Sequence, residues 1–290
     1  MTDESFFSRR LTSSELDIWL ELGKISGAND QSKFAKMFMN LESSMFFVSY
    51  VGEDLIGGTA IYKDQIRLGM AIVNARIVPS WRERTSVQII KSSLPFFRSA
   101  SIRDVDVIIS SEEKESEYPF PFNFVLDHWT QTALEKNGFE EESLLFNVTG
   151  DNPASSEVES SDWDTTMNLE SLKKLFWKSD LKCSLFWYLM DIHKEEGIIQ
   201  TASDNEDVRF GLGISKVSNS TVIVTLLMNE SLIDYDAVAK SILYESRKLS
   251  AERIVFPLLS GRQLGLIDTL ETMTGNEYDK KELKLLRKNL

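Results

Sequence analysis

Residues 78–88, VPSWRERTSVQ, lie between an apolar segment and an amphipathic one, and their side chains could hold a phosphate group. Arg82 and Arg84 supply two cations, and Thr85 and Ser86 supply hydroxyl donors. The start of a helix adds unpaired backbone N–H groups and the positive end of the helix dipole, which together attract an anion. The pattern is typical of an anion site, or of a capped helix start that binds nothing.

Two features of this turn weaken the anion site. The stretch lacks the glycines that let a backbone bring its N–H groups close to a phosphate. In addition, Glu83 places a carboxylate in the first helical turn, where it interacts favourably with the helix dipole and competes with a phosphate for the same position. The cations favour an anion site, whereas Glu83 favours an ordinary helix start.

The composition is that of a soluble globular protein with two domains. The chain has 290 residues, which is comfortable for two domains of about 100 to 150 residues each. Its hydrophobic share of 42% and charged share of 27% are ordinary for a globular protein. The formal net charge of -13 repels a phosphate backbone, and no basic face is visible in the sequence, so we expect no nucleic-acid partner.

Cysteine and histidine are too scarce for a structural metal site or a disulfide. Cys183 is the single cysteine, and His128 and His193 are the two histidines, so a structural zinc site is not expected. No apolar run approaches the roughly 20 residues that a membrane helix needs, and the N-terminus lacks a signal-peptide core. We therefore expect a cytoplasmic protein without a membrane partner.

An acidic, serine-rich stretch divides the chain. Residues 149–165 carry too few apolar groups to offset the entropy of ordering them. We therefore expect an N-terminal domain over 1–148, an acidic linker over 149–165 and a C-terminal domain over 166–290. A second polar stretch, 110–123, is expected to be an exposed loop whose aromatic end, 118–122, could line a cleft.

The first half predicts two helices, three strands, then helix, strand, helix and strand. Gly52 marks a hairpin turn, Pro95 should kink or shorten the third helix, and Gly138 suits the left-handed position that ends the fourth. Strand, helix and strand in succession predict a parallel crossover beside the antiparallel hairpin. The expected elements fall within residues 13–26, 30–42, 44–64, 67–79, 82–100, 102–110 and 124–148.

Three pieces of this half resemble the GNAT superfamily of N-acetyltransferases. They are the hairpin VSYVGEDLIGGTAIY, the crossover NARIVPSWRERTSVQIIKSSL and the helix end ALEKNGFEEE, and the resemblance covers residues 10–148. It implies an α/β fold with a mixed, mostly antiparallel sheet flanked by helices. It also implies binding of acetyl-CoA or another acyl-CoA, with the pyrophosphate at the crossover turn and the pantetheine arm along the preceding strand.

The resemblance assigns cofactor-binding roles to particular residues. Ile77 and Val78 would contact the thioester, and Arg82, Arg84, Thr85 and Ser86 would hold the pyrophosphate. The family's Arg-Gly-x-Gly pattern falls on residues 82–85, where both glycines are absent.

The catalytic acid that the resemblance implies is also missing. In the family a tyrosine on the last helix often protonates the departing thiolate, and Leu134 occupies that position here. An aliphatic side chain cannot transfer a proton, so Asp127, His128 or Tyr118 would have to replace it. Each of these three is also a plausible structural residue, and no catalytic residue is assigned.

The second half repeats part of this order and resembles a second, more divergent GNAT-type domain. A helix over 168–179, a strand pair over 208–229, a helix over 234–250 and a strand over 251–259 are expected, whereas 180–197 has no clear assignment. The chain therefore resembles the tandem members of the superfamily, in which one copy is commonly inactive.

The second half contains fewer residues that could bind an anion. Its crossover turn carries Glu230, Asp234 and Asp236, which would repel a pyrophosphate, and SGRQLG at 260–265 is an anion-site candidate or a plain loop. The last stretch, 278–290, predicts a basic amphipathic helix. The aromatic residues are expected to form core or interdomain packing; they are Phe176, Trp177, Phe186, Trp187 and Tyr188.

Two functions follow. The first is an acyl-CoA-dependent N-acetyltransferase acting on a small-molecule or peptide amine, for which the negative surface would favour a cationic acceptor. The second is a catalytically inactive binding or scaffold protein that keeps the fold without acetyl-CoA. The oligomeric state is not predicted.

Overall fold

The computed structural model describes residues 5–27, 32–99, 101–111, 124–152, 165–166, 168–204, 207–229 and 234–290. The chain forms two compact units. The N-terminal unit comprises Met1–Ser143 together with Lys284–Leu290, and the C-terminal unit comprises Leu144–Leu283. Most of the predicted linker and most of the predicted loop at 110–123 lie outside the described residues.

The N-terminal unit is built on a mixed sheet. Its strands follow the order β1-β2-β3-β4-β5 and continue into β13. The first four pair antiparallel, and β4 pairs parallel with β5, so the predicted hairpin and parallel crossover are confirmed. The strands are β1 (Phe6–Arg10), β2 (Ser44–Val51), β3 (Asp54–Asp64), β4 (Gly69–Ile77), β5 (Asp104–Ser110) and the short β6 (Val125–Leu126).

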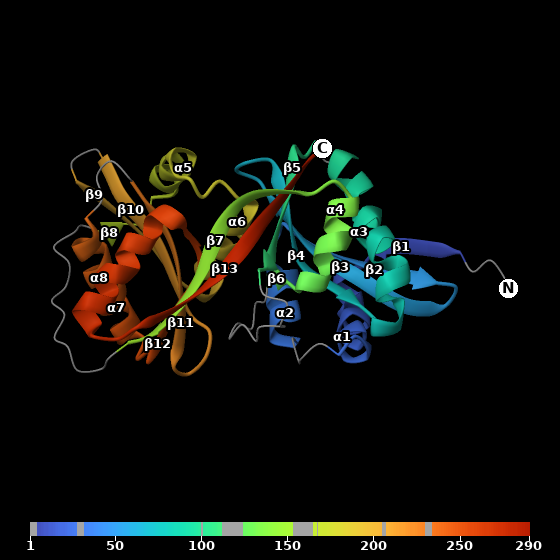
Figure 1. Cartoon of the computed structure of the whole chain (residues 1–290), viewed down its shortest axis with the longest axis horizontal. Helices are drawn as coiled ribbons and strands as arrows, with labels where there is room; N and C mark the ends of the chain where they lie inside the picture. The colour runs from blue at the N-terminus through green and yellow to red at the C-terminus, as the bar shows by residue number, and fades with distance from the viewer. Residues whose placement is uncertain are drawn as a thin grey trace. The chain divides into compact units, whose positions relative to one another are not determined.

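Helices cover both faces of this sheet (Figure 1). The pair α1 and α2 packs on one face of the central strands, and the pair α3 and α4 packs on the other. The helices are α1 (Leu16–Ile25), α2 (Ser32–Asn40), α3 (Arg82–Ser99) and α4 (Gln131–Lys136), with short 3-10 turns η1 (Ser13–Glu15), η2 (Pro79–Trp81) and η3 (His128–Thr130) before α1, α3 and α4.

Two adjacent glycines in β3 allow the helices to approach both faces closely. A Cβ added at Gly57 would lie 2.6 Å from Ile89 of α3, and one added at Gly58 would lie 3.1 Å from Trp19 of α1. Because neighbouring residues of a strand point to opposite faces, this pair thins the sheet on both sides at once. Helix packing therefore requires both glycines.

Gly58→Ala is expected to destabilise the N-terminal unit by about 1–3 kcal/mol, because overpacking forces the backbone to move. The added Cβ would lie 2.3 Å from the carbonyl oxygen of Phe47, which is a backbone atom of β2. Urea unfolding of the full chain measures the change. Gly261→Ala is the control, since its Cβ would meet Phe146 at an ordinary 3.9 Å; equal midpoints for the two variants would contradict the prediction.

The predictions made from single glycine and proline residues in this half are confirmed in part. Gly52 and Gly138 adopt positive φ angles of 61° and 80°, as a tight turn and a helix end require. Pro95 lies inside α3, which runs on to Ser99, so it does not shorten the helix, and the other alternative, a kink, stays a prediction. The sequence reading also missed β1, which begins the sheet before α1.

The C-terminal unit repeats the arrangement. Its strands follow the order β7-β12-β11-β10-β9-β8, and β11 pairs parallel with β12 across the crossover helix α7. The strand pair predicted over 208–229 is confirmed as antiparallel β10 and β11. The strands are β8 (Thr165–Thr166), β9 (Gly197–Asp204), β10 (Asp207–Lys216), β11 (Thr221–Met228) and β12 (Arg253–Ser260).

Its helices again form two pairs. The unassigned segment contains α6, in which nine of 13 residues are buried. α5 lies against Gly211 of β10, and α6 lies against Gly213. Most of the predicted aromatic core packing is confirmed, whereas Trp177 is 50% exposed. The helices are α5 (Leu169–Lys178), α6 (Ser184–Glu196), α7 (Tyr235–Lys248) and α8 (Leu264–Thr274), with η5 (Gly261–Gln263) before α8.

Two long strands belong partly to each unit. β7 (Glu140–Asp151) begins in the N-terminal unit and continues in the C-terminal one, and β13 (Tyr278–Asn289) does the reverse. The predicted C-terminal helix is therefore wrong: neighbouring strands bind its backbone, and this tertiary context overrides its helix-favouring Lys and Leu residues. Residues 149–151, expected in the linker, are likewise paired in β7, with Val148 and Gly150 buried.

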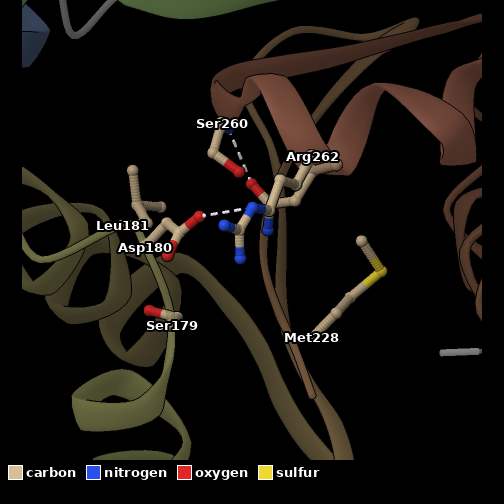
Figure 2. A pocket seen from close by; sticks show the side chains of 7 residues that line it. Ser179, Asp180, Leu181, Met228, Ser260 and Arg262 are labelled. Carbon is tan, nitrogen blue, oxygen red and sulfur yellow. Dashed lines mark hydrogen bonds and ion pairs between the residues drawn. The ribbon is translucent and has the colours of Figure 1, made fainter. Parts of the chain in front are cut away.

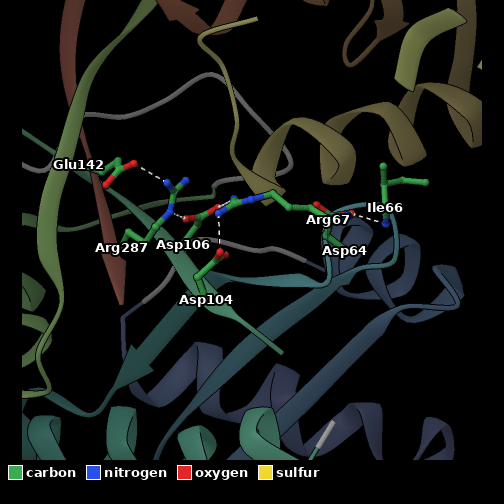
Figure 3. Close-up of polar contacts among 7 residues, drawn as sticks. All are labelled: Asp64, Ile66, Arg67, Asp104, Asp106, Glu142 and Arg287. Carbon is green, nitrogen blue, oxygen red and sulfur yellow. Dashed lines mark hydrogen bonds and ion pairs between the residues drawn. The ribbon is translucent and has the colours of Figure 1, made fainter. Parts of the chain in front are cut away.

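An ion network fixes the end of β13 inside the N-terminal unit (Figure 3). The fully buried carboxylate of Asp106 accepts Arg67 Nη1 at 2.6 Å and Arg287 Nε at 2.8 Å. Arg67 also binds Asp104, and Arg287 binds Glu142. Burial raises the pKa of the Asp104 carboxyl above its ordinary value although Arg67 opposes the shift. The network therefore ties β13 to β5 by charges that are costly to leave unpaired.

None of the helices in the described ranges is long and apolar enough to cross a membrane. Within those same ranges, no group of three or more His, Cys, Asp or Glu residues is arranged to hold a metal ion.

Candidate functional site

The turn predicted to hold an anion joins β4 to α3 through η2, and its hydroxyl groups are buried. Thr85 Oγ1 donates to the carbonyl oxygen of Trp81 over 2.9 Å, and both Thr85 and Ser86 are at most 9% exposed. A hydroxyl bonded to the preceding helical turn stabilises that turn. In this conformation the Thr85 hydroxyl therefore stabilises the start of α3.

The two cations of the turn differ in their surroundings. The guanidinium of Arg82 lies 4.7 Å from the ring centre of Trp129, and the indole N–H of Trp129 donates to Asp127 over 3.0 Å. Arg84 is exposed beside the exposed Glu83. Arg82 is thus oriented by a cation–π contact, whereas Arg84 stays in solvent and can reach an anion. The sequence did not indicate a role for Trp129, because its contact with Arg82 joins residues far apart in the chain.

β4 contains a β-bulge, and it is paired with β5 over only part of its length. Pairing with β3 shifts between Ala60 and Ile61, whose partners are Asn74 and Ile72, so Val73 is the extra residue of a β-bulge. The parallel pairing of β4 with β5 ends at Ala71. Beyond that point, β4 and β5 have no paired residues in the described part of the chain.

The backbone N–H groups of Ile77 and Val78, at the end of β4, point in opposite directions. The N–H of Val78 donates to the carbonyl oxygen of Ile56 over 2.9 Å, so it points toward β3. Successive residues of a strand alternate the side to which their N–H groups point, so the N–H of Ile77 points away from β3 toward the gap. Of the two predicted thioester contacts, Ile77 is therefore the one whose N–H is suitably directed.

The short strand β6 stands in that gap. Val125 and Leu126 pair parallel with Ile108 and Ile109, the part of β5 that lies beyond its pairing with β4. β13 takes the other edge of β5, and β6 also lies against β4. Both β6 side chains are buried. The chain itself thus occupies the space between β4 and β5.

The corresponding region of the C-terminal unit is closed by a side chain. The register between β10 and β11 runs without a shift from Phe210 to Lys216, so this copy shows no bulge there. Gln263 donates to the carbonyl oxygen of Leu226 in β11 over 3.0 Å and accepts from the N–H of Ser260 in β12 over 2.9 Å. The amide group therefore bridges β11 and β12 where they separate.

Acidic side chains lie at both turns of the C-terminal unit that the sequence analysis considered, the crossover turn and the SGRQLG turn. Asp234 caps α7 by accepting the N–H of Ala237 over 3.0 Å, while Glu230 lies outside the described residues. Arg262, from the SGRQLG turn, forms an ion pair with Asp180 at 3.0 Å beside a small hollow (Figure 2). The turn itself is a capped helix start in which Ser260 and Gln263 bond each other reciprocally.

Solved structures with a similar fold include GCN5-related N-acetyltransferases. A GCN5-related N-acetyltransferase from Sphaerobacter thermophilus matches with a TM-score of 0.60 at 8% identity, over 98% of this chain and 95% of that chain. A tandem GNAT protein from the clavulanic acid biosynthesis pathway matches with a TM-score of 0.59 at 10% identity, over 98% of each chain. The chain has the tandem GNAT fold.

A longer protein also contains this fold. The glucosamine N-acetyltransferase region of a fungal multi-domain β-N-acetylglucosaminidase matches with a TM-score of 0.65 at 10% identity, over 98% of this chain. The chain spans 38% of that protein. No family model and no curated protein matches the sequence. At such identities the likeness establishes the fold, and activity has to be argued from the site.

Of the residues considered as the acid of a GNAT reaction, the structure describes Asp127 and His128, and both contact neighbouring protein groups. Leu134 is fully buried in the core under α3 and α4. Asp127 binds the Trp129 indole, and His128 Nδ1 lies 3.4 Å from the carbonyl oxygen of Ser110. Tyr118 lies outside the described residues. None of the described candidates combines an exposed position with a partner that would relay a proton.

A buried arginine stands on the opposite face of β4. Arg76 donates to the carbonyl oxygen of Trp19 over 2.8 Å and lies 4.6 Å from the Trp19 ring centre. Burial lowers its pKa to about 10, so it stays protonated at neutral pH. Gly23 makes room for it, because a Cβ there would lie 2.6 Å from Arg76 Nη1. The sequence reading missed this residue, for which β-strand alternation alone gives no signal.

Proposed function

We propose that the N-terminal unit is an N-acyltransferase that uses acetyl-CoA or another acyl-CoA. The observation that carries the proposal is the bulge at Val73 of β4, beyond which β4 no longer pairs with β5. There the N–H of Ile77 points into the gap beside β5, just before the helix start that holds Arg82 and Arg84. A backbone donor directed at a developing oxyanion is a common source of rate enhancement. In the described part of the C-terminal unit, β11 pairs with β10 without a bulge, and the sequence of its crossover turn, 228–237, contains no Arg or Lys.

The proposed reaction needs little from side chains. A neutral amine forms a bond to the thioester carbonyl carbon, the C–S bond breaks, and the proton lost by nitrogen passes to the departing thiolate. Ile77 polarises the carbonyl through its N–H, and Arg82 and Arg84 attract the pyrophosphate. Val78 shapes the strand end, because its N–H is bonded to β3. Thr85 and Ser86 would join the site only if the turn opened, since both are buried.

The acceptor is proposed to be a small-molecule or peptide amine. The net charge of -13 surrounds the site with a negative field, which concentrates cationic molecules near the surface. An amine that is protonated in solution would arrive by this attraction and would have to lose its proton before attack.

A second candidate function is favoured by β6 and Trp129. Val125 and Leu126 lie in the gap beside β5, and Trp129 lies against Arg82, so both stand where a pantetheine arm and a pyrophosphate would bind. A protein that kept this conformation would bind other molecules through the fold without using acyl-CoA.

Acetyl-CoA titration of the full chain decides between the two. For the enzyme, we expect saturable heat with a dissociation constant below about 1 mM, weakened at least tenfold in the Arg82→Glu, Arg84→Glu variant. The charge reversal removes both cations of the turn and adds two anions that repel the pyrophosphate.

The control reverses two charges on the same helix. Lys91→Glu with Arg98→Glu alters two exposed cations of α3 beyond its first turns, so it changes the net charge equally without touching the turn. We expect it to bind like the unaltered chain. No heat at millimolar acetyl-CoA would exclude the acyltransferase and leave the binding protein, and equal weakening by both variants would reduce the effect to net charge.

A further inference from the structure

The strand β1 lies at the end of the strand order, so one of its edges has no strand beside it in the described part of the chain. Its pairing with β2 runs without a shift over the whole strand. The N–H of Leu11 and the carbonyl oxygen of Ser5 both bond to β2, which assigns the hydrogen bonds of that edge to the odd-numbered residues. The N–H and C=O groups of Phe6, Ser8 and Arg10 therefore point away from β2, toward the outer edge.

An outer edge of this kind can pair with a second copy of itself. In an antiparallel pair, a residue whose N–H and C=O groups both point toward the partner exchanges two hydrogen bonds with the residue opposite it. When Ser8 lies opposite the partner's Ser8, Phe6 lies opposite the partner's Arg10, so the outward groups of all three residues are bonded. This register is two-fold symmetric, as a closed dimer requires.

The sequence of β1, FFSRR, is complementary to itself in this register. Phe7 lies opposite the partner's Arg9, and Phe6 lies opposite the partner's Arg10, so each aromatic ring meets a guanidinium, a favourable cross-strand contact. A shift by two residues would place either Arg9 opposite Arg9 or Phe7 opposite Phe7. It would also leave one of the three outward residues without its counterpart in β1. The register centred on Ser8 is therefore favoured.

The side chains on one face of β1 already form such contacts within the unit. The Phe7 ring is 44% exposed and stacks on Tyr50 of β2, with ring centres 5.0 Å apart. The guanidinium of Arg9 lies 6.0 Å from the centre of the same ring and pairs with Glu15 at 2.8 Å. Because Glu15 compensates the charge of Arg9, a second Arg9 can approach the exposed Phe7 ring with little repulsion between the two cations.

We propose that the chain forms a symmetric dimer in which β1 pairs antiparallel with β1 of a second copy, centred on Ser8. The strand order of the N-terminal unit then continues from one copy into the other. Since only five residues of each strand take part, the interface is small, and we expect a dissociation constant of about 1–100 µM. The inference does not depend on acyl transfer, because its experiments contain no acyl-CoA.

Sedimentation equilibrium of the full chain between about 5 and 500 µM tests for the dimer. We expect the average mass to rise with concentration from that of one chain toward that of two. A mass that stays at one chain over the whole range would overturn the proposal.

Substitutions at Ser8 test whether this edge forms the dimer. Ser8→Pro removes an outward N–H, which an edge strand tolerates, and is expected to weaken dimerisation at least tenfold. Ser8→Ala is the matched control, because it loses the same hydroxyl, which lies 2.6 Å from Ser49 Oγ, and keeps the N–H. We expect Ser8→Ala to dimerise like the unaltered chain. Equal dimerisation of the two variants would contradict the proposal.

Disulfide crosslinking tests the register and does not rely on the proline variant. In an antiparallel hydrogen-bonded pair the Cα atoms lie about 5.5 Å apart, which a disulfide can span, so Ser8→Cys is expected to give a covalent dimer under oxidising conditions. Two copies of Arg10 would lie four residues apart along the strands, roughly 14 Å, which is too far. Arg10→Cys is therefore expected to stay monomeric although Arg10 is the more exposed residue. Cys183 is buried and common to both variants. Equal crosslinking of the two variants, or none in Ser8→Cys, would overturn the proposal.

Discussion

Deletion of Lys284–Leu290 is expected to unfold the N-terminal unit while the C-terminal unit stays folded. These residues form the end of β13, which pairs with β5 inside the N-terminal unit. Leu285 and Leu286 are at most 3% exposed, and loss of a buried leucine side chain removes about 2–5 kcal/mol. The sum over both leucines is comparable with the whole stability of a domain, about 5–15 kcal/mol.

The deletion also removes one cationic partner of a buried carboxylate. Asp106 loses Arg287 and keeps Arg67, while its side chain is fully buried. Leaving a buried charge without any partner costs about 3–5 kcal/mol, and because Arg67 still pairs with Asp106 the cost here is smaller. Loss of packing and loss of charge pairing therefore act in the same direction.

Hydrogen exchange of the truncated chain measures the outcome by region. We expect amides of β2, β3 and β4 to lose protection and amides of β10 and β11 to keep it. Deletion of Met1–Arg10 is the control, because it removes β1, a strand at the end of the order, and should leave β3 and β4 protected. Retained protection of β3 and β4 after loss of Lys284–Leu290 would show that β13 is dispensable.

The conformation of β13 could not be predicted from its own residues. Turns and helix ends are encoded by nearby residues, so Gly52 predicted the hairpin turn and Gly138 predicted the end of α4. The order of the elements between them could be predicted in the same way. Pairing between β5 and β13 joins residues far apart in the chain, and a Lys- and Leu-rich segment carries no local sign of such a partner. Its helix-like composition gave the wrong prediction because the neighbouring strands determined its conformation.

The candidate site shows the same division. The sequence placed the cations Arg82 and Arg84 at a helix start after a strand, and the structure has them there. It could not reveal that Trp129 covers Arg82 or that β6 enters the gap beside β5, because both contacts depend on the return of the chain after residue 123. Contacts between segments that are far apart in the chain leave no periodic pattern in the sequence.

Acidification is expected to destabilise the C-terminal unit through one histidine. His193 of α6 is fully buried, with Nδ1 2.6 Å from Ser215 Oγ and Nε2 2.8 Å from Thr225 Oγ1. The two hydroxyl groups can satisfy a neutral imidazole in either tautomer. Burial lowers the pKa of His193 from 6.5 to about 3, so the folded unit holds the neutral form.

The direction and size of the effect follow from linkage. The unfolded chain binds a proton at His193 below its ordinary pKa of 6.5, whereas the folded chain does not until about pH 3. The stabilisation by neutral His193 is therefore complete above pH 6.5 and is lost as the pH falls toward 3. Each pH unit within that window changes the free energy of unfolding by up to about 1.4 kcal/mol, which gives roughly 2–3 kcal/mol between pH 6.5 and 4.5.

Urea unfolding of the full chain and of His193→Gln, measured from pH 7.5 to 4.5, tests this expectation. Glutamine is neutral throughout, can still donate and accept hydrogen bonds with Ser215 and Thr225, and leaves every carboxylate in place. The difference between the two proteins therefore isolates the histidine. We expect the stability of the C-terminal unit to fall with acid about 2–3 kcal/mol less in the variant. Parallel curves would show that His193 is protonated in the folded unit as readily as in the unfolded chain, and that burial does not keep it neutral.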